Sequence, residues 1–157
     1  MITEMLREYE QKIIQSRKDL KLFYKSHNKA DEIFIVESDR NRLIQVVTNL
    51  LNNAIKFTNE GIITVIVERK KDDNSNNNEI VVSIKDTGTG IDAEILPKLF
   101  TKFATKSFHG IGLGLFISKS IIEAHGGRIW AENNQKGQGA TFSFVLPFDN
   151  SEQGNSK

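Results

Sequence analysis

Asn49-Leu-Leu-Asn-Asn53-Ala-Ile-Lys56-Phe57-Thr58 is the stretch that decides the fold, and its polar residues follow a helical spacing. Asn49, Asn53 and Lys56 are separated by four and three positions, so two carboxamides and an ammonium group share one side of a helix. Carboxamide oxygens are neutral ligands suited to Mg²⁺, which also binds phosphate oxygens. The stripe predicts a metal and phosphate site, and a solvated helix face is the plainer alternative.

The helix that carries this stripe is predicted to begin at an N-cap offered by Ser38 or Asp39 and to run to about Phe57. Upstream of it, Ile33–Val36 is a candidate for a short strand. The predicted core face of the helix repeats at spacings of three and four and consists of Leu43, Val46, Val47, Leu50, Ala54 and Phe57.

The N-terminal segment has a helical repeat of its own, which predicts a helix over about residues 1–27. Two interpretations are open: this helix lies on its own domain, or it is part of a dimerising helical hairpin. We accordingly separate residues 1–30 from a globular unit over 31–148 and from a polar, disordered tail over 149–157. The repeat, with one polar member, consists of Ile2, Leu6, Tyr9, Ile13, Ser16, Leu20 and Phe23.

Beyond residue 58 the pattern changes from one helix to several short elements. Helices and strands do not alternate in a regular βαβ order, which favours an α+β two-layer sandwich. The expected elements are strands Ile62–Glu68 and Glu79–Lys85 joined by the polar loop Lys70–Asn78, helices over Asp92–Phe103 and Phe116–Ala124, and strands Arg128–Glu132 and Ala140–Leu146.

A second constellation, Asp86-Thr-Gly88-Thr-Gly90-Ile91, directly follows a predicted strand. Glycines let the backbone approach a flat ligand, and the carboxylate could accept a hydrogen bond from an adenine amino group. A turn capped by the aspartate is the plainer alternative. A calcium loop is rejected because its twelfth position is Pro97 instead of glutamate. A dinucleotide fingerprint is rejected because no second parallel strand ending in an acidic residue follows.

A third constellation, Gly110-Ile111-Gly112-Leu113-Gly114-Leu115, opens a predicted helix. A glycine-rich entrance to a helix presents free backbone N–H groups and the positive end of the helix dipole, which suits a phosphate. The stretch is not a Walker A loop, since no Gly-Lys-Ser/Thr follows at the required spacing. Close packing of the glycines is the plainer alternative.

The composition limits the classes of function. The chain has 157 residues, enough for one domain, and its 21 basic and 20 acidic residues create no field that would attract nucleic acid. It has no cysteine, which excludes disulfides, thiolate metal sites and thiol catalysis. No apolar run approaches the roughly 18 residues of a membrane span. We expect a cytoplasmic domain without a membrane segment of its own, and a membrane anchor elsewhere in a longer parent protein is compatible with this.

In their order and spacing these stretches resemble the sequence boxes of the sensor histidine kinase ATP-binding domain, a member of the GHKL superfamily. The resemblance runs from about Asp39 to Phe148 and implies the Bergerat fold, a mixed and largely antiparallel sheet covered by helices on one face, here preceded by an N-terminal helix. The matched stretches are residues 49–58 (N box), 86–91 (first glycine box), Phe100-Thr-Lys-Phe103 (F box), 110–115 (second glycine box) and Gly137-Gln-Gly-Ala-Thr141-Phe (last glycine box).

The resemblance implies ATP and Mg²⁺ as ligands. Asn53 and Asn49 would hold Mg²⁺, and Lys56 would contact phosphate. Asp86 would bind the adenine amino group, with Thr141 near it through water. Phe100 and Phe103 would anchor a lid over the nucleotide, and a plainer role as core aromatics is compatible with this. The full set of expected nucleotide-binding residues is Asn49, Asn53, Lys56, Asp86, Gly88, Gly90, Ile91, Lys106, Gly110, Gly112, Leu113, Gly114, Leu115 and Thr141.

Two departures from the family pattern, at Thr105 and Ile111, and one residue that separates the kinases from related ATPases, Asn49, bear on activity. Thr105 stands where family members often carry a lid arginine, so Lys106 is expected to supply the phosphate contact as a point charge. Ile111 replaces a common threonine. Asn49 stands where related ATPases place a glutamate, and a neutral carboxamide cannot act as a general base. We therefore expect slow intrinsic hydrolysis.

The acceptor histidine of a kinase is missing, because none of His27, His109 and His125 is followed by an acidic residue. No catalytic residue is therefore assigned in this chain. The resemblance implies a protein histidine kinase domain whose acceptor lies on a dimerisation and histidine-phosphotransfer domain, in cis or in trans, upstream of a response regulator. An ATP-regulated protein-binding module of anti-sigma or scaffold type, without phosphotransfer, is the alternative.

Overall fold

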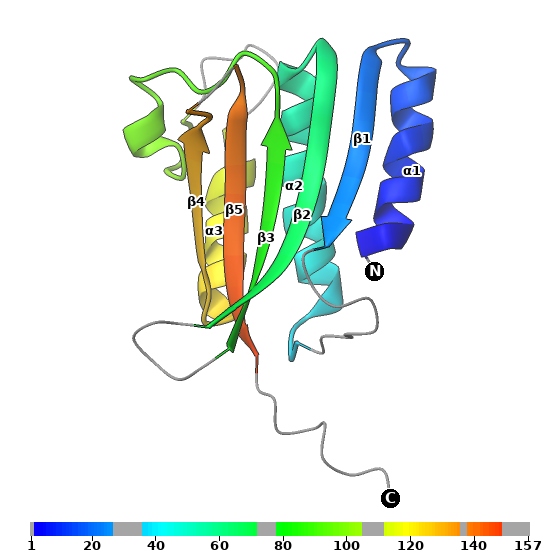
Figure 1. Ribbon diagram of the computed structural model, residues 1–157. Coiled ribbons are helices and arrows are strands. Elements are labelled where there is room, and N and C mark those ends of the chain that lie inside the picture. Colours follow the sequence, from blue (N-terminus) through cyan, green and yellow to red (C-terminus); the bar gives the residue numbers. More distant parts are fainter. Residues whose placement is uncertain (1, 27–35, 72–77, 105–111, 136–137, 149–157) are drawn as a thin grey trace, which may run out of the picture.

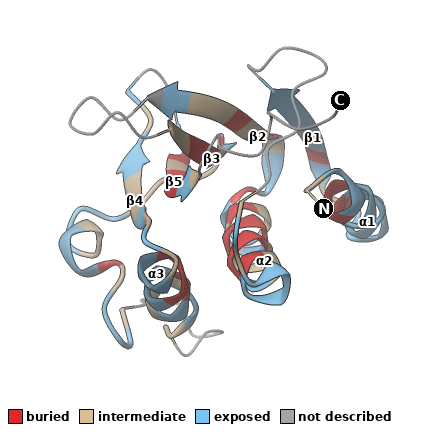
Figure 2. Ribbon diagram, turned by 90° about the horizontal axis from the view of Figure 1, so that it is seen from below, coloured by how far each residue is buried: buried red, intermediate tan, exposed pale blue. Residues whose placement is uncertain are grey.

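A five-stranded mixed sheet with helices on one face forms the protein (Figure 1; Figure 2). The computed structural model describes residues 2–26, 36–71, 78–104, 112–135 and 138–148. The strand order is β1-β2-β3-β5-β4; β1 is parallel to β2 and the other pairs are antiparallel. The elements are α1 (Ile2–Gln15), β1 (Asp19–Ser26), α2 (Arg40–Phe57), β2 (Glu60–Lys71), β3 (Asn78–Asp86), the 3-10 helix η1 (Leu96–Lys98), α3 (Gly114–Ala124), β4 (Arg128–Asn133) and β5 (Ala140–Phe148). The predicted α+β sandwich is confirmed.

Helix α2 forms the centre of the core. The Asp39 carboxylate accepts hydrogen bonds from the backbone N–H groups of Asn41 and Arg42, which confirms the predicted N-cap. Leu51 is fully buried although the predicted core face omitted it, whereas Phe57 is 45% exposed and was wrongly assigned to the core. Phe57 is the last helical residue before the extended cap at Thr58, so no neighbouring turn covers its ring.

The predicted helix over residues 1–27 is wrong beyond Gln15. The chain reverses at Arg17, whose φ is +56°, and Asp19–Ser26 becomes edge strand β1 beside β2. Leu20 and Leu22 pack into the core in the alternation of a strand. Leu20 lies seven residues after Ile13, a spacing that also fits a helix, and for this reason the helical pattern extended too far.

Helix α1 packs on this domain through one apolar side. Met5, Leu6, Tyr9 and Ile13 are buried in the same core as α2. The Tyr9 hydroxyl donates to Asn52 Oδ1 on α2, 3.0 Å away. Of the two interpretations of the N-terminal helix, this packing agrees with the one in which the helix lies on its own domain.

Lys18 caps the C-terminal end of α2. Its Nζ donates to the carbonyl oxygens of Ile55 and Thr58, at 2.6 and 3.2 Å, where the helix dipole is negative. We expect Lys18→Met to lower the free energy of unfolding by about 1 kcal/mol, measured by urea denaturation. Lys21→Met, at an exposed lysine on β1, is the matched control with an expected change within about 0.5 kcal/mol. Equal losses in both variants would show that the cap contributes nothing.

The other differences from the predicted elements are small. Strands β2, β3, β4 and β5 include the predicted ranges and extend beyond them. The predicted helix over Asp92–Phe103 is wrong, since only η1 forms there. Pro97 lacks a backbone N–H, and the Asp92 carboxylate accepts from the N–H of Glu94 in a turn. The strand expected at Ile33–Val36 and the tail over 149–157 lie outside the described residues, apart from Val36.

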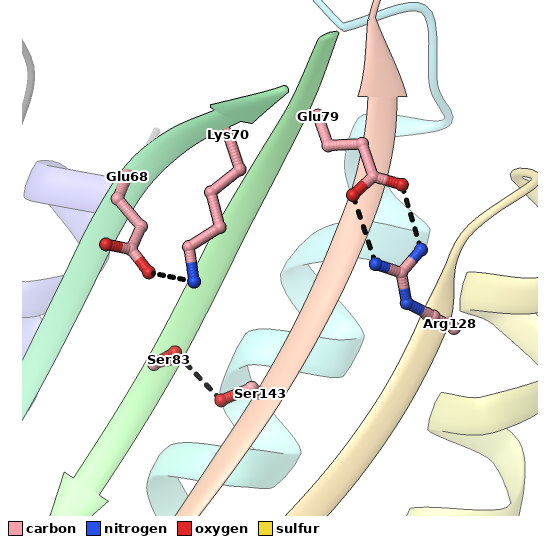
Figure 3. Close-up of polar contacts among 6 residues, drawn as sticks. All are labelled: Glu68, Lys70, Glu79, Ser83, Arg128 and Ser143. Carbon is pink, nitrogen blue, oxygen red and sulfur yellow. Dashed lines mark hydrogen bonds and ion pairs between the residues drawn. The ribbon is translucent and has the colours of Figure 1, made fainter. Parts of the chain in front are cut away.

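On the sheet face opposite the helices, several polar side chains pair with one another (Figure 3). Both guanidinium N–H₂ groups of Arg128 contact the Glu79 carboxylate, at 2.8 and 3.1 Å. The hydroxyls of Ser83 and Ser143 form a 2.8 Å hydrogen bond between β3 and β5. Val81 on β3 and its register partner Val145 on β5 are nevertheless buried.

Candidate functional site

Asp86 ends β3 and is the centre of the candidate site. It is only 3% exposed, and its Oδ1 accepts hydrogen bonds from the backbone N–H groups of Gly88 and Ala140, at 2.9 and 3.2 Å. Burial raises the pKa of the Asp86 carboxyl, and these two hydrogen bonds partly oppose that rise. Within the described residues Oδ2 accepts no hydrogen bond, so this oxygen can accept one from a ligand.

The loop after Asp86 rests on the end of α2. The backbone N–H of Thr89 donates to the Phe57 carbonyl at 3.2 Å, next to the exposed Phe57 ring. The Thr58 hydroxyl is buried against this loop and has no hydrogen-bond partner among the described residues. The loop therefore joins the end of β3, where Asp86 lies, to the end of α2, where Phe57 lies.

Two asparagines that sequence reasoning missed hold the loop in place. Asn134 Nδ2 donates to the main-chain oxygens of Asp86 and Gln138, at 2.8 and 3.1 Å. Asn133 bonds both to the N–H and to the carbonyl of Ile91, at 2.7 and 2.9 Å. An Asn-Asn pair directly after a predicted strand was the available signal, because asparagine side chains commonly bond nearby backbone in turns.

Thr141 lies near Asp86 in the sheet but faces away from its carboxylate. Thr141 pairs with Lys85, and its side chain is on the face of β5 opposite to that of Ala140. Its hydroxyl donates to Asn134 Oδ1 at 2.7 Å. In this structure Thr141 acts on the Asp86 segment through Asn134.

Asn134 is expected to contribute measurably to stability. Asn134→Ala removes three hydrogen bonds and leaves the Asp86 carbonyl without its side-chain donor, which should cost about 1–3 kcal/mol in chemical denaturation. Gln135→Ala, at its exposed neighbour, is the control and should change stability by less than about 0.5 kcal/mol. A loss no larger than that of the control would contradict the assigned role.

The predicted stripe lies on α2 as expected from its spacing. Asn49 and Asn53 are half-buried and Lys56 is exposed. The Lys56 ammonium lies 5.2 Å from the centre of the Phe57 ring. No group of three or more acidic, histidine or cysteine side chains in the described part of the chain could hold a metal. A cation here would thus depend on the two carboxamides and on oxygens of its ligand, a set that suits Mg²⁺.

The glycine-rich stretch ends at the first turn of α3. The Phe103 N–H donates to the Gly112 carbonyl at 3.0 Å, and Leu113 is the N-cap of the helix that Gly114 and Leu115 begin. Phe103 is 67% exposed with a φ of +62°, so the plainer role of this residue as a core aromatic is wrong. Its expected role as an anchor of the lid stays a prediction.

The F box is anchored by its other phenylalanine. Phe100 packs against the core as expected. The expected ligand contacts at Lys106 and Gly110, and the departure from the family pattern at Ile111, lie outside the described residues.

His125 has a structural role. Its Nε2 accepts a hydrogen bond from the Asp39 N–H at 3.1 Å, so the proton of the neutral ring is on Nδ1, which donates to the Ile121 carbonyl at 2.7 Å. The histidine thus joins the end of α3 to the cap of α2. His27 and His109 lie outside the described residues.

A mixed sheet with helices on one face, and a buried aspartate where the central strand ends, agree with the α+β ATP-binding domain expected above. Residues 38–150 match the family described as histidine kinase-, DNA gyrase B-, and HSP90-like ATPase. The chain belongs to this family, and ATP binding is the property that the family implies.

The relatives identify the branch of the family. The chain is 43% identical to the sensor protein FixL of Bradyrhizobium diazoefficiens. The aligned region covers 72% of this chain and 22% of FixL. It is 35% identical to the sensor histidine kinase WalK of Bacillus subtilis over 77% of its length and 20% of that protein. The chain thus spans about a fifth of these relatives.

Solved structures of histidine kinases are also similar to this chain. The catalytic domain of the histidine kinase ThkA has a TM-score of 0.77 and 35% identity, covering 93% of this chain and 89% of that one. ThkA is also known in complex with the response regulator TrrA, with a TM-score of 0.72 and 33% identity over 97% of this chain and 40% of that one. The resemblance to the catalytic, ATP-binding domain of sensor histidine kinases is confirmed. No helix in the described residues has both the length and the apolar character to cross a membrane.

Proposed function

We propose that this domain binds Mg·ATP at the end of the sheet and donates the γ-phosphoryl group to a histidine on a dimerisation and histidine-phosphotransfer domain. The observation that carries the proposal is the buried Asp86 carboxylate, whose Oδ1 is held by two backbone N–H groups while Oδ2 is left for a ligand. That oxygen would accept the adenine amino group. The exposed Phe57 ring, at the end of α2 against which the loop after Asp86 rests, would supply an aromatic surface for the base.

The phosphates would lie between α2 and the first turn of α3. Asn49 and Asn53 would hold Mg²⁺, which neutralises charge on the phosphate oxygens when bound. Lys56 would add a positive charge, and the N–H groups at the start of α3 would face the phosphates. Gly88, Gly90 and Ile91 would border the base, while Lys106 and Gly110 through Leu115 would form the lid.

Asn49 favours transfer over hydrolysis. A carboxamide cannot remove a proton from water, so the γ-phosphoryl group is kept for a better nucleophile. We propose a response regulator as the downstream partner and the cytoplasm as the compartment, because sensor histidine kinases such as WalK and the solved ThkA complex are similar to this chain.

Calorimetric titration with a non-hydrolysable ATP analogue tests the proposal. Micromolar binding that strengthens with Mg²⁺ is expected for the native domain, and Asn53→Ala should lose most of the Mg²⁺ effect. Added to a hairpin domain that carries an acceptor histidine, the native domain and ATP should produce an acid-labile phosphoprotein. Binding without any transfer to a competent acceptor would contradict the kinase assignment, and absence of binding would contradict the whole proposal.

A further inference from the structure

Helix α3 contacts both ends of the Asn49 carboxamide. Asn49 Nδ2 donates to Ser118 Oγ at 3.0 Å, and Ser118 is 2% exposed. A Cβ on Gly114 would collide with Asn49 Oδ1, so only a glycine lets the first turn of α3 approach this oxygen. Gly114 and Ser118 are four positions apart and lie on one side of the helix. The carboxamide therefore spans one turn of α3.

The polarity of α3 favours the same orientation of the carboxamide as the hydrogen bond to Ser118. The backbone N–H groups of the first turn have no partner within the helix and carry its positive dipole end. An oxygen is favoured there, and an NH₂ group is not. Asn49 Oδ1 consequently faces the exposed Gly114, while Nδ2 is directed into the buried interface, where Ser118 Oγ accepts its proton.

We propose that Ser118 is a positioning residue of the nucleotide site, which holds Asn49 so that Oδ1 is presented to the nucleotide-bound Mg²⁺. The inference rests on the proposed function, because it assigns a use to that oxygen. Without the Ser118 hydroxyl the carboxamide can rotate and offer its NH₂ group, which cannot bind a cation. The expected lid ends at Gly112 and Gly114, which are close to Ser118 in the sequence. Helix α3 therefore also connects that end of the lid to Asn49.

The ratio of the Kd values for an ATP analogue without and with Mg²⁺ measures this role. Ser118→Ala should lower the ratio by roughly three- to tenfold, the factor that corresponds to one hydrogen bond, and should leave the Mg²⁺-free Kd unchanged. Ser120→Ala is the matched control, because Ser120 is exposed on the same helix and its hydroxyl donates to the Phe116 carbonyl. The control should keep the native ratio. A Ser118→Ala domain with the native ratio, or with equal losses in both Kd values, would overturn the inference.

A second measurement needs no nucleotide. In an NMR spectrum with assigned side-chain amides, the Asn49 NH₂ signals should shift and exchange with water faster in Ser118→Ala than in the native domain. They should remain native in Ser120→Ala. Unchanged Asn49 signals in Ser118→Ala would overturn the positioning role even in a domain that bound no nucleotide. Failure of nucleotide binding in the native domain would instead count against the proposed function.

Discussion

Asp86→Asn is expected to abolish nucleotide binding without unfolding the protein. The backbone N–H groups of Gly88 and Ala140 require an acceptor, so the amide oxygen of the new side chain stays with them. Its NH₂ group then takes the place of Oδ2. The adenine amino group would meet a second hydrogen-bond donor there instead of an acceptor. We expect affinity for an ATP analogue to fall by about a hundredfold or more in calorimetry. An affinity within a few fold of the native value would contradict the role of Oδ2.

The same variant should be at least as stable as the native protein. Burial raises the pKa of Asp86, so the fold disfavours the charged carboxylate. The stabilisation from the protonated form is therefore present below the ordinary aspartate pKa and is lost as the pH rises through the raised value. The carboxamide that replaces the carboxyl in the variant cannot ionise. As the pH rises from the ordinary aspartate pKa to the raised pKa of Asp86, the native protein should therefore lose stability relative to the variant. Denaturation at a series of pH values measures this difference in the free energy of unfolding.

Gly139→Ala is expected to have the largest effect on the fold. Gly139 has a φ of +97°, and a Cβ there would collide with the Asp86 carbonyl oxygen and lie 2.8 Å from its Oδ1. Backbone atoms cannot yield as a flexible side chain does, so β5 must move away from the end of β3. We expect a loss of about 3 kcal/mol or more in unfolding free energy, together with lost nucleotide binding.

Gly126→Ala separates backbone strain from this collision. Gly126 also has a positive φ, +74°, but its Cβ would meet only the Pro147 side chain at an ordinary 3.6 Å. Its expected cost is about 1 kcal/mol, with nucleotide binding retained. If the two variants lost the same stability, the approach of Gly139 to Asp86 would have no special importance.

Those parts of the fold and site that depend on local spacing could be predicted from the sequence. The cap at Asp39, the polar side of α2 and the position of Asp86 after a strand all follow from residues within one element. The end of α1 could not be predicted, because Leu20 fits a helical and a strand repeat equally well. Only the pairing of β1 with β2, 41 residues further along the chain at Asp19 and Glu60, decides between them.

The supporting residues of the site were missed for a related reason. Asn134 and Asn133 bond main-chain atoms of Asp86 and Ile91, which are 48 and 42 positions away. Such bonds leave no periodic trace in a sequence. The exposure of Phe57 and Phe103 was missed because a phenylalanine in an apolar pattern predicts burial, whereas a helix end and a positive φ expose these two rings.

The hydrogen bond between the Phe103 N–H and the Gly112 carbonyl has a consequence for protein engineering. It holds together the two points between which residues 104–111 are inserted, so the spacing between η1 and α3 does not depend on the length of that insertion. Doubling the length of a segment closed in this way costs only about 0.6 kcal/mol in chain entropy. We therefore expect a change in the length of residues 104–111 to have little effect on the free energy of unfolding of the rest of the domain.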